Sequence, residues 1–546
     1  MRTGADYRQS LRDGRRVWVM GEGLIDDVTT HPATRAVVEE YVAWYDRHSD
    51  PAWADTVLAA DHTPLAYMLP RSADDLVRMG RSFSATTFLS AGNITHTPAY
   101  GHLISLGILA AVQERNVSPK QIADATAIRE LIARTGRFLT FSGGGATIGY
   151  RLREDPRERA AFRIVKETDA GLVITGKIGM HTSPAFAEDV FIGGQTGIEI
   201  GAHRATFIVP VGAPGVTTVC RKIAVRDANP FVAPLSSRYD ELDGQMWLDD
   251  VFIPWERIFL LDVSPEPIAR WLLWHQLYCW LSKAEFTLGL ALACTHAMGL
   301  IEHETTIDYL LDLITDVQTI RSCQTAAERD PQFTPEGYCY PNHSHLAAGS
   351  IATLKSRQRM SEILRIVPGS SLVVAPTDRD LAAPDVAAGL EESFGGGGYT
   401  ALQRSALLQM AWDHVSSALD ARESAFELHA NGGMPVWRSR LRRNFDRYNE
   451  LANAVLRTMG VPMPEIDLNS IRAAAFAPRR PVAPPPPRDR YTRCSPVIGG
   501  IRLPCMADTH ASAGSGPCGA TLERGRKPLD QMELELELAA RHAVRR

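Results

Sequence analysis

The sequence contains no CxxC cysteine pair and no long uninterrupted run of apolar residues. Its eight cysteines are spaced in a way that fits neither a zinc site nor a disulfide framework. No window is apolar over the length of a membrane span, and the charged first residues are not followed by the apolar segment of a signal peptide. We therefore predict no metal site, no membrane partner and a reducing compartment, the cytoplasm.

A strong charge of either sign is also missing. The 546 residues carry a formal net charge of −5 with 22% charged residues, which describes an ordinary surface without a bias toward nucleic acid. Hydrophobic residues make up 45% of the chain, enough for sizeable cores, and the length predicts two or three domains. The composition therefore favours a multidomain globular protein.

The first region, residues 1–145, has a mainly helical pattern. Ser72 and Ser118 are the expected N-caps of two helices, because a side-chain oxygen there can accept a hydrogen bond from a free backbone N–H. Pro119 suits the first position of the second helix, and Gly136 is expected to end it. This region is predicted to be an N-terminal helical domain.

The pattern changes twice more along the chain. Residues 146–266 contain short β-branched runs separated by Gly, Pro and Asp-Ala-Gly turns, which predict an antiparallel β domain. Amphipathic helical spacing returns over residues 267–470 and predicts a helix bundle. Residues 471–546 include "FAPRRPVAPPPPRDRYTR" and few bulky apolar residues, so a mostly disordered tail is expected. The predicted fold class is α+β, with a ligand cleft where the three domains meet.

Several blocks of sequence carry a family resemblance. They are "YRQSLRDGRRVWVMGEGLIDDVTTHPATR" (7–35), "KETDAGLVITG" (166–176), "PLSSRYDELDGQMWLDDVFIPWERI" (234–258) and "LQRSALLQMAWD" (402–413). In this order they resemble the oxygenase component of the 4-hydroxyphenylacetate 3-monooxygenase family, over roughly residues 6–460.

The resemblance implies an acyl-CoA-dehydrogenase-like fold and a homotetramer. It also implies that a separate flavin reductase supplies FADH2, which reacts with O2 to a flavin C4a-hydroperoxide. One oxygen atom then passes to an aromatic, phenol-like substrate. Such chemistry needs a closed, dry pocket and groups that favour the phenolate form of the substrate.

The expected catalytic motif of the family is changed in this sequence. The segment "GNITHTPAYGH" keeps Thr97, Pro98 and Tyr100, but His96 stands where the family has an arginine. A later family histidine falls on Phe141, which cannot transfer a proton. By resemblance, Tyr100 and His96 are the candidate catalytic residues and Phe141 a candidate substrate contact.

Other positions are assigned by the same resemblance. Gln195 and Thr196 correspond to a loop that caps the substrate, with a plain turn as the competing interpretation. The expected flavin contacts are Gly145, Thr182, Gly432 and Gly433. His181 is expected on the surface of the β domain, and Arg422 to reach a phosphate or to form a surface salt bridge.

The changed motif leaves alternatives open. The substrate could need no deprotonation, His96 could act as a relocated base, or the oxygenase chemistry could differ altogether. The competing interpretation of His96 is that it only packs and hydrogen-bonds locally. The altered chemistries are N-oxygenation, a dehydratase or isomerase reaction of the 4-hydroxybutyryl-CoA type, and a catalytically weak flavoprotein that forms peroxide. The dehydratase type needs an iron–sulfur cluster held by several cysteines, and the stretch 86–100, which should supply the first pair, has none.

Overall fold

The structure is a computed structural model that describes residues 1–115, 117–142, 145, 147–193, 198–200, 203–225, 229–261, 266–459 and 461–473. Two compact units are distinguished, one formed by Met1–Phe445 and a smaller one that begins at Asp446. None of the helices in the described ranges combines the length and the apolar character needed to cross a bilayer.

The N-terminal helices form as their capping residues predict. The side chain of Ser72 accepts from Asp75 N at the start of α4, and that of Ser118 accepts from Gln121 N at the start of α6. Gly136 ends α6 with φ 64° and ψ 25°, a left-handed conformation that glycine adopts without steric cost. The helices are α1 (Gly4–Ser10), α2 (Arg35–Asp46), α3 (Ala54–Val57), η1 (Leu65–Tyr67), α4 (Ala73–Leu89), α5 (Pro98–Arg115) and α6 (Pro119–Thr135).

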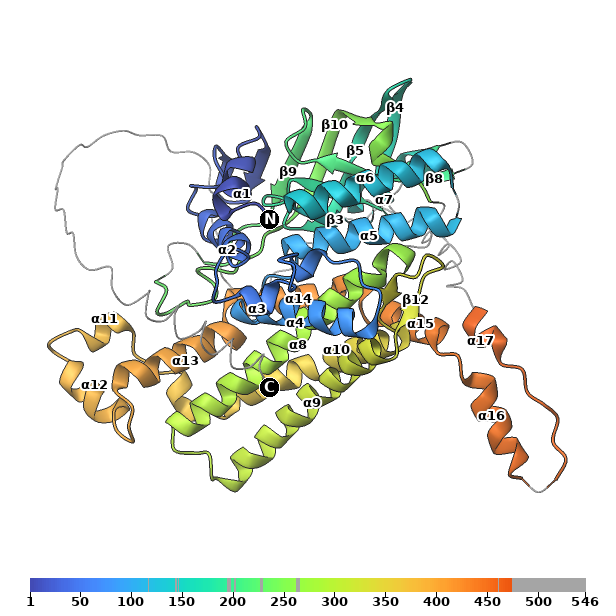
Figure 1. The fold of residues 1–546 in the computed structure, drawn as a ribbon. Coiled ribbons are helices and arrows are strands. Elements are labelled where there is room, and N and C mark those ends of the chain that lie inside the picture. Colours follow the sequence, from blue (N-terminus) through green and yellow to red (C-terminus); the bar gives the residue numbers. More distant parts are fainter. Residues whose placement is uncertain are drawn as a thin grey trace, which may run out of the picture. The chain divides into compact units, whose positions relative to one another are not determined.

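Helix α5 is the centre of this region. It packs against α6, against β3 and against α8 of the bundle, and its residues from Pro98 to Val112 are all buried (Figure 1). A helix that is apolar on every side is stable only when other elements surround it. The first turn of α5, which carries Tyr100, is therefore fixed from several directions.

Two sheets make up the β domain. The larger has the strand order β2 (Gly23–Ile25), β1 (Arg16–Val19), β9 (Val216–Cys220), β10 (Asp243–Pro254), β5 (Gly171–Thr182), β4 (Phe162–Thr168). The smaller has the order β11 (Ile258–Leu260), β8 (His203–Pro210), β6 (Asp189–Ile192), β3 (Leu139–Ser142), with β7 (Ile198–Ile200) also paired to β8. One buried apolar cluster contains Ile174 and Ile253 from the larger sheet and Val190 and Phe207 from the smaller one, so the sheets bury a common core.

Strands from the N-terminal region join this domain, which the sequence analysis did not predict. β1 runs parallel to β9 and antiparallel to β2, so residues 16–25 extend the larger sheet at one edge. β3, within the predicted helical region, pairs with β6 in the smaller sheet. The domain boundaries at residues 145, 266 and 470 stay predictions.

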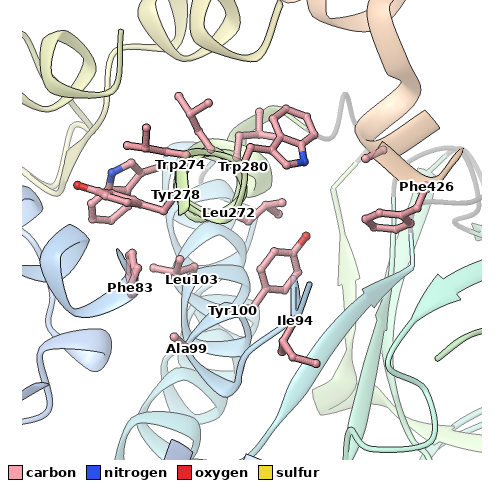
Figure 2. Close-up of a cluster of buried hydrophobic side chains, with 14 of the residues drawn as sticks. Phe83, Ile94, Ala99, Tyr100, Leu103, Leu272, Trp274, Tyr278, Trp280 and Phe426 are labelled. Carbon is pink, nitrogen blue, oxygen red and sulfur yellow. The ribbon is translucent and has the colours of Figure 1, made fainter. Parts of the chain in front are cut away.

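The predicted helix bundle follows the β domain. Its central helix, α8 (Glu266–Ala297), packs against α4, α5, α9 and α10 and carries the fully buried Trp271, Trp274 and Trp280. Figure 2 shows the rings of Trp274 and Trp280 on α8, with Tyr100 of α5 beside Leu272. The other main helices are α9 (Glu304–Arg329), α10 (His343–Ile366), α13 (Ala401–Ser416), α14 (Ala418–His429) and α15 (Gly433–Asn444).

Shorter elements connect these parts. They are α7 (Ile148–Arg151), η2 (Pro156–Arg159), η4 (Trp255–Arg257), β12 (Gln332–Phe333), β13 (Cys339–Tyr340), η5 (Gly369–Leu372), α11 (Asp378–Leu381), α12 (Ala387–Phe394) and η6 (Ala430–Gly432). The smaller unit contains α16 (Tyr448–Arg457) and α17 (Asn469–Ala473), and Asn453 of α16 holds Ile466 by hydrogen bonds to its backbone N–H and carbonyl. The predicted tail lies outside the described residues beyond position 473.

The segment between β9 and β10 is tied to the bundle by one carboxylate. Asp413 of α13 accepts hydrogen bonds from Leu235 N at 2.7 Å and Ser236 N at 2.8 Å, and also from the Ser236 hydroxyl. Hydrogen bonds to a charged acceptor are stronger than those between neutral groups. The chain that leads from Leu235 to Glu241 is thereby held against α13.

The turn between α14 and α15 depends on left-handed backbone. Asn431, Gly432 and Gly433 all have positive φ, and a Cβ added to Gly432, at φ +90°, would lie 2.3 Å from Val436 Cγ2. We expect Gly432→Ala to lower the free energy of unfolding by about 1–3 kcal/mol, through backbone strain and this clash. Differential scanning calorimetry or denaturant titration measures the change.

Gly389→Ala is the matched control for this prediction. Gly389 is exposed in α12, and an added Cβ would meet nothing within 4 Å. The same substitution should therefore be neutral or stabilising by up to about 1 kcal/mol, because alanine favours the helix. Equal effects of the two substitutions would contradict the proposed role of Gly432.

Candidate functional site

A cavity of about 460 Å³ lies where α5, α8, the β domain and the α14–α15 turn meet. This volume is within the range of about 300–1,000 Å³ that is typical of small-molecule sites. Its walls come from segments far apart in the sequence. The lining residues are His96, Tyr100, Phe141, Met180, His181, Thr182, Phe191, Ile268, Ala269, Leu272, Gln276, Phe426, His429, Ala430, Asn431, Gly432, Val436 and Arg440.

Five residues singled out in the sequence lie together in this cavity. They are His96, Tyr100, Phe141, Thr182 and Gly432. The cavity thus brings the candidate catalytic residues next to two candidate flavin contacts, while the role of each residue stays a prediction.

The remaining candidates are placed differently. Gly433 is buried next to the cavity wall without lining it, and a Cβ there would lie 2.5 Å from Leu428 O. Gly145 is exposed and accepts a hydrogen bond from Gly179 N at 3.2 Å, so the structure does not place it in the cavity. Gln195 and Thr196 lie outside the described residues.

His96 is held by its neighbour Thr95 and by Glu241. The backbone N–H of His96 donates to Glu241 Oε1 at 2.9 Å, and the Thr95 hydroxyl donates to Glu241 Oε2 at 2.6 Å. The Thr95 oxygen also lies 2.9 Å from His96 Nδ1. Because the only hydroxyl proton of Thr95 goes to the carboxylate, Nδ1 of His96 must be the donor in this contact. Nε2 of a neutral His96 is then a proton acceptor.

Burial determines the protonation state of these groups. It lowers the pKa of His96, against the attraction of Glu241 and Asp243, so the ring is neutral at neutral pH. Burial alone would raise the pKa of Glu241, but His96 and hydrogen bonds from Thr95 and Ser183 bring the net pKa below its usual value. Glu241 is therefore an anion that neutral donors stabilise.

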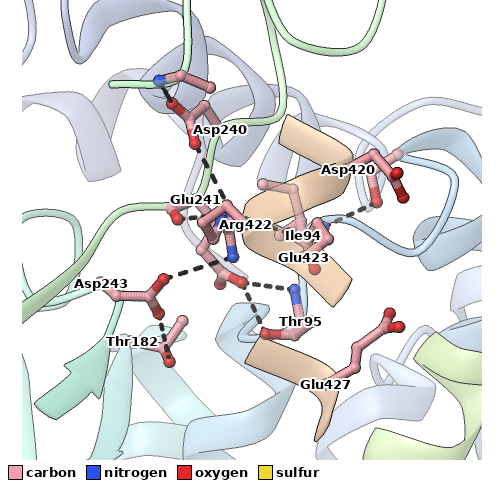
Figure 3. Close-up of polar contacts among 12 residues, drawn as sticks. Ile94, Thr95, Thr182, Asp240, Glu241, Asp243, Asp420, Arg422, Glu423 and Glu427 are labelled. Atoms are coloured by element: carbon pink, nitrogen blue, oxygen red, sulfur yellow. Dashed lines mark hydrogen bonds and ion pairs between the residues drawn. The ribbon is translucent and has the colours of Figure 1, made fainter. Parts of the chain in front are cut away.

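Glu241 is also fixed from the bundle side, as Figure 3 shows. Its backbone carbonyl accepts from Arg422 Nη2 at 2.9 Å, and Ser183 Oγ donates to its carboxylate at 2.7 Å. Arg422 is only partly exposed and pairs with Asp243 at 3.5 Å and with the buried Glu423 at 2.8 Å, so its ion pairs are not the surface salt bridge that was expected. Arg422 does not line the cavity.

Tyr100 lies against His96, with ring centroids 4.3 Å apart. Burial raises the pKa of the Tyr100 hydroxyl far above its usual value, so the phenol stays protonated and is a hydrogen-bond donor. Behind it, His275 Nε2 lies 3.0 Å from the Thr97 hydroxyl, and burial lowers the pKa of His275 to about 3. The Tyr100 ring therefore lies against two neutral, buried histidine rings, those of His96 and His275.

Thr182 is anchored at the end of β5. Its hydroxyl donates to Asp243 Oδ1 at 3.0 Å, and its backbone carbonyl accepts from the Thr140 hydroxyl at 2.9 Å. The Thr182 hydroxyl oxygen can therefore only accept a hydrogen bond from a bound molecule. The position of Thr182 is rigid because both of its bonds run to neighbouring segments of the sheets.

His181 is not on the surface, which corrects the sequence-based expectation. It is buried and lines the cavity, and neither ring nitrogen has a hydrogen-bond partner among the described residues. The buried Gln276 Nε2 in the cavity wall also has no hydrogen-bond partner among the described residues. Buried polar atoms without partners are costly, so these atoms are available to hydrogen-bond a polar ligand.

Sequence analysis placed His181 on the surface and did not name other polar residues of the cavity, such as Gln276 and Arg440. The alternation of β5 could have indicated that one of His181 and Thr182 faces inward, but not that both are buried at the strand end. Within the described residues, no group of three or more His, Cys, Asp or Glu side chains is placed to hold a metal ion.

Comparison with known proteins agrees with this geometry. Residues 3–260 match the family model for the N-terminal part of 4-hydroxyphenylacetate 3-hydroxylase, and residues 267–459 match the model for its C-terminal part. A similar protein is the oxygenase component of 4-nitrophenol 4-monooxygenase/4-nitrocatechol 2-monooxygenase from Rhodococcus opacus, 31% identical over 470 residues, 81% of this chain and 87% of that protein.

Other relatives extend the comparison. The oxygenase component of 4-hydroxyphenylacetate 3-monooxygenase from Thermus thermophilus is 26% identical, over 78% of this chain and 91% of that protein. A solved structure of such an oxygenase component with FAD has a TM-score of 0.75 at 24% identity, covering 84% of this chain and 98% of that one. An archaeal 4-hydroxybutyryl-CoA dehydratase from N. maritimus has a TM-score of 0.73 at 15% identity, covering 85% and 96% respectively, and shows the shared fold alone.

The predicted α+β fold of N-terminal helices, β domain and helix bundle is confirmed. Since the two family models together span most of residues 3–459, and a relative above 30% identity covers four-fifths of the sequence, the chain belongs to the 4-hydroxyphenylacetate 3-hydroxylase family.

Proposed function

We propose that this protein is the oxygenase component of a two-component monooxygenase that uses FADH2 and O2 to insert one oxygen atom into a phenol-like aromatic substrate. A separate flavin reductase would supply the reduced FAD. The proposal depends on one observation: Tyr100, a protonated donor, lies beside His96, a neutral acceptor, in the wall of the same cavity. Family membership supports the same reaction.

The residues of the cavity fit a flavin and a small aromatic molecule. His181 and Gln276 offer buried polar atoms without partners, and the left-handed turn at Gly432 keeps side-chain atoms away from one wall. Thr182, His181 and Gly432 would hold the flavin. When bound, reduced FAD supplies the two electrons that reduce one atom of O2 to water while the other atom enters the substrate.

His96 would take the proton of the substrate hydroxyl. Its Nδ1–H is engaged by the Thr95 oxygen, so Nε2 is the nitrogen with a lone pair for a proton. The imidazolium that forms would lie with Nδ1 3.8 Å from Glu241 Oε1, and this anion stabilises the positive charge. Removing the proton makes the aromatic ring a better nucleophile. We therefore favour the relocated base among the alternatives that the sequence leaves open.

Tyr100 would donate its O–H to the same substrate oxygen. A protonated phenol next to a developing phenolate stabilises the negative charge without bringing in water. Phe141 stacks on Phe191 with ring centroids 5.8 Å apart, and both rings line the cavity. Phe141, where the family has a histidine, then serves as a wall that keeps this part of the cavity dry.

The dehydratase alternative lacks its ligands at this cavity. None of the described lining residues is a cysteine, and the buried Cys279 is directed to Thr95 O and His275 Nδ1 at 3.7 and 3.6 Å. Burial also raises the pKa of the Cys279 thiol, which disfavours the thiolate needed for a cluster.

We also propose that the chain forms a homotetramer in the cytoplasm. Helix α9 exposes Ile307, Leu311 and Ile314 at helical spacing, and α13 exposes Leu402 and Trp412, so apolar surface is available for contacts between copies. The five cysteines that the structure describes are free, which supports a reducing compartment. A monomer or dimer in analytical ultracentrifugation would contradict the tetramer.

The proposed reaction is tested by mixing the protein, prereduced FAD and isotopically labelled O2 with a panel of phenols. We expect one labelled oxygen atom in the aromatic product. Tyr100→Phe should lower the product formed per flavin oxidised by about 10-fold or more, while the affinity for reduced FAD changes much less, because only the donor to the substrate is lost. Chromatography of the product and fluorescence titration of flavin measure the two quantities.

Tyr309→Phe is the control for this substitution, since Tyr309 lies on α9 and does not line the cavity. It should leave the coupling of flavin oxidation to product unchanged. Equal coupling in wild type and Tyr100→Phe would contradict the role of Tyr100, and no labelled product from any phenol would contradict the proposed function.

His96→Gln should lower the rate of hydroxylation of an un-ionised phenol by about 100-fold or more, the range expected for a general base. Because burial lowers the pKa of His96 below 6.5, the wild-type rate should hold from neutral pH into mildly acidic pH and fall once the ring becomes protonated. Single-turnover rates measured against pH test this profile.

The rate of the His96→Gln variant should not show this fall at acidic pH. The variant should also lose less activity with a phenol that is fully ionised at the assay pH, since no proton then has to be removed. The control is His303→Gln, an exposed histidine outside the cavity. Equal losses with ionised and un-ionised phenols would show that His96 only packs.

A further inference from the structure

One polar side chain of the cavity takes no part in the proposed reaction. Gln276 is 1% exposed and lines the cavity, and its Nε2 has no hydrogen-bond partner among the described residues. An amide nitrogen carries two N–H groups, and leaving them unpaired in a buried place is costly. The Gln276 amide is therefore available to donate to an acceptor on a bound molecule.

The neighbours of Gln276 fix the direction in which its side chain points. Successive residues of an α-helix are turned by about 100° from one another. On α8, Trp274 Nε1 donates to Glu328 of α9 at 2.8 Å, and His275 Nε2 lies 3.0 Å from the Thr97 hydroxyl before α5. Gln276, the next residue, lines the cavity instead. Contacts on two other sides of α8 thus hold this residue toward the cavity.

Gln276 is also close to the candidate catalytic residues. Ile268, Leu272 and Gln276 follow one another at a spacing of four, so they share one face of α8, and all three line the cavity. Figure 2 shows Leu272 beside Tyr100. Gln276 is one helical turn, roughly 6 Å along the helix, from Leu272. A substituted phenol that contacts Tyr100 can therefore reach Gln276 as well.

The hydroxyl group of the substrate does not need Gln276. In the proposed site, Tyr100 donates to the phenolic oxygen and Nε2 of His96 takes its proton. The proposed flavin contacts come from the end of β5 and from the turn between α14 and α15. Gln276 of α8 is thereby left for a second acceptor on the aromatic ring.

Much of the described lining is apolar. It includes Phe141, Phe191, Ile268, Leu272, Phe426 and Val436. Packing against such side chains binds an aromatic ring without fixing its orientation, and the few polar groups of a pocket supply that orientation and the specificity. A buried donor in this lining therefore distinguishes between rings that are otherwise of the same size.

We propose that Gln276 is a specificity-determining residue that donates a hydrogen bond to a second acceptor group on the substrate ring, such as a nitro or acyl oxygen. It thereby selects phenols with such a substituent over phenols with an alkyl group in its place. A phenol without the acceptor leaves the amide buried and unpaired, which lowers its relative affinity. This inference rests on the proposed function, because it names the substrate class of the same site.

Two phenols of similar shape test this selection. 4-Hydroxyacetophenone carries a carbonyl oxygen where 4-isopropylphenol carries a methyl group, and both keep their hydroxyl proton at mildly acidic pH. Each is titrated calorimetrically into wild type, Gln276→Met and Gln358→Met, with the protein alone and with oxidised FAD bound. Methionine is unbranched like glutamine but has no N–H donor. Gln358 is exposed on α10 and does not line the cavity, so its variant is the matched control.

Gln276→Met should bind 4-hydroxyacetophenone about 3- to 10-fold more weakly than wild type, as expected for one neutral hydrogen bond. Its affinity for 4-isopropylphenol should be unchanged or higher, and its affinity for reduced FAD should equal that of wild type. Gln358→Met should match wild type in every titration. Gln276→Asn, whose amide is one methylene shorter, should also weaken binding of 4-hydroxyacetophenone selectively, and it provides a readout if the methionine variant does not fold.

The melting temperature is a second readout. Gln276→Met should melt no lower than wild type, because it removes a buried donor that has no partner among the described residues. A lower melting temperature together with equal effects on the two phenols would show that the amide supports the fold.

Three binding results would overturn the inference. They are equal effects of Gln276→Met on the two phenols, weaker binding of reduced FAD with both phenol affinities unchanged, and no binding of 4-hydroxyacetophenone to either form of the wild type. The second of these would assign the amide to the flavin. Failure of the proposed function is a different result. In that case, binding of 4-hydroxyacetophenone would still depend on Gln276, but no labelled oxygen would enter any phenol.

Discussion

The buried carboxylate of Glu241 connects the parts of the chain that form the site. It lies in the segment before β10, and it binds the turn before α5 through Thr95 and His96 and the end of β5 through Ser183. A buried charge is tolerated only where favourable partners surround it, and here His96 and hydrogen bonds from Thr95 and Ser183 bring the pKa of Glu241 below its usual value in spite of burial. Because the bundle, through Arg422, binds the carbonyl of the same residue, the cavity walls share one anchor.

This anchor also determines the protonation states of the candidate catalytic residues His96 and Tyr100. The Thr95 proton goes to Glu241, which selects the His96 tautomer with a free Nε2 lone pair. The same burial that fixes the tautomer makes His96 a weak base and keeps Tyr100 protonated. A weak base of this kind takes a proton most readily from an acidic hydroxyl group.

Local sequence signals were sufficient for some of these features. The caps at Ser118 and Gly136 follow from backbone chemistry within a few residues, and the resemblance identified Tyr100 and His96 before any contact was known. The pairing of β1 with β9 joins segments some 200 residues apart, so no local pattern could indicate it. Arg440 lies in a helix with several other arginines, and only the fold distinguishes it from the exposed Arg438. His181 was missed for the same reason.

The way in which position 96 is held explains how its chemistry can differ from that of the family. Glu241 binds the backbone N–H of His96 and both polar groups of Thr95, whereas the His96 side chain lies 3.8 Å from the carboxylate. The turn is therefore fixed by atoms that do not depend on the side chain at position 96. Breaking the buried network would leave a charge without partners, at a cost of roughly 3–5 kcal/mol, while exchanging one cavity-facing side chain leaves that network intact. In such a site, the geometry of the scaffold and the identity of the proton-transferring group can vary separately.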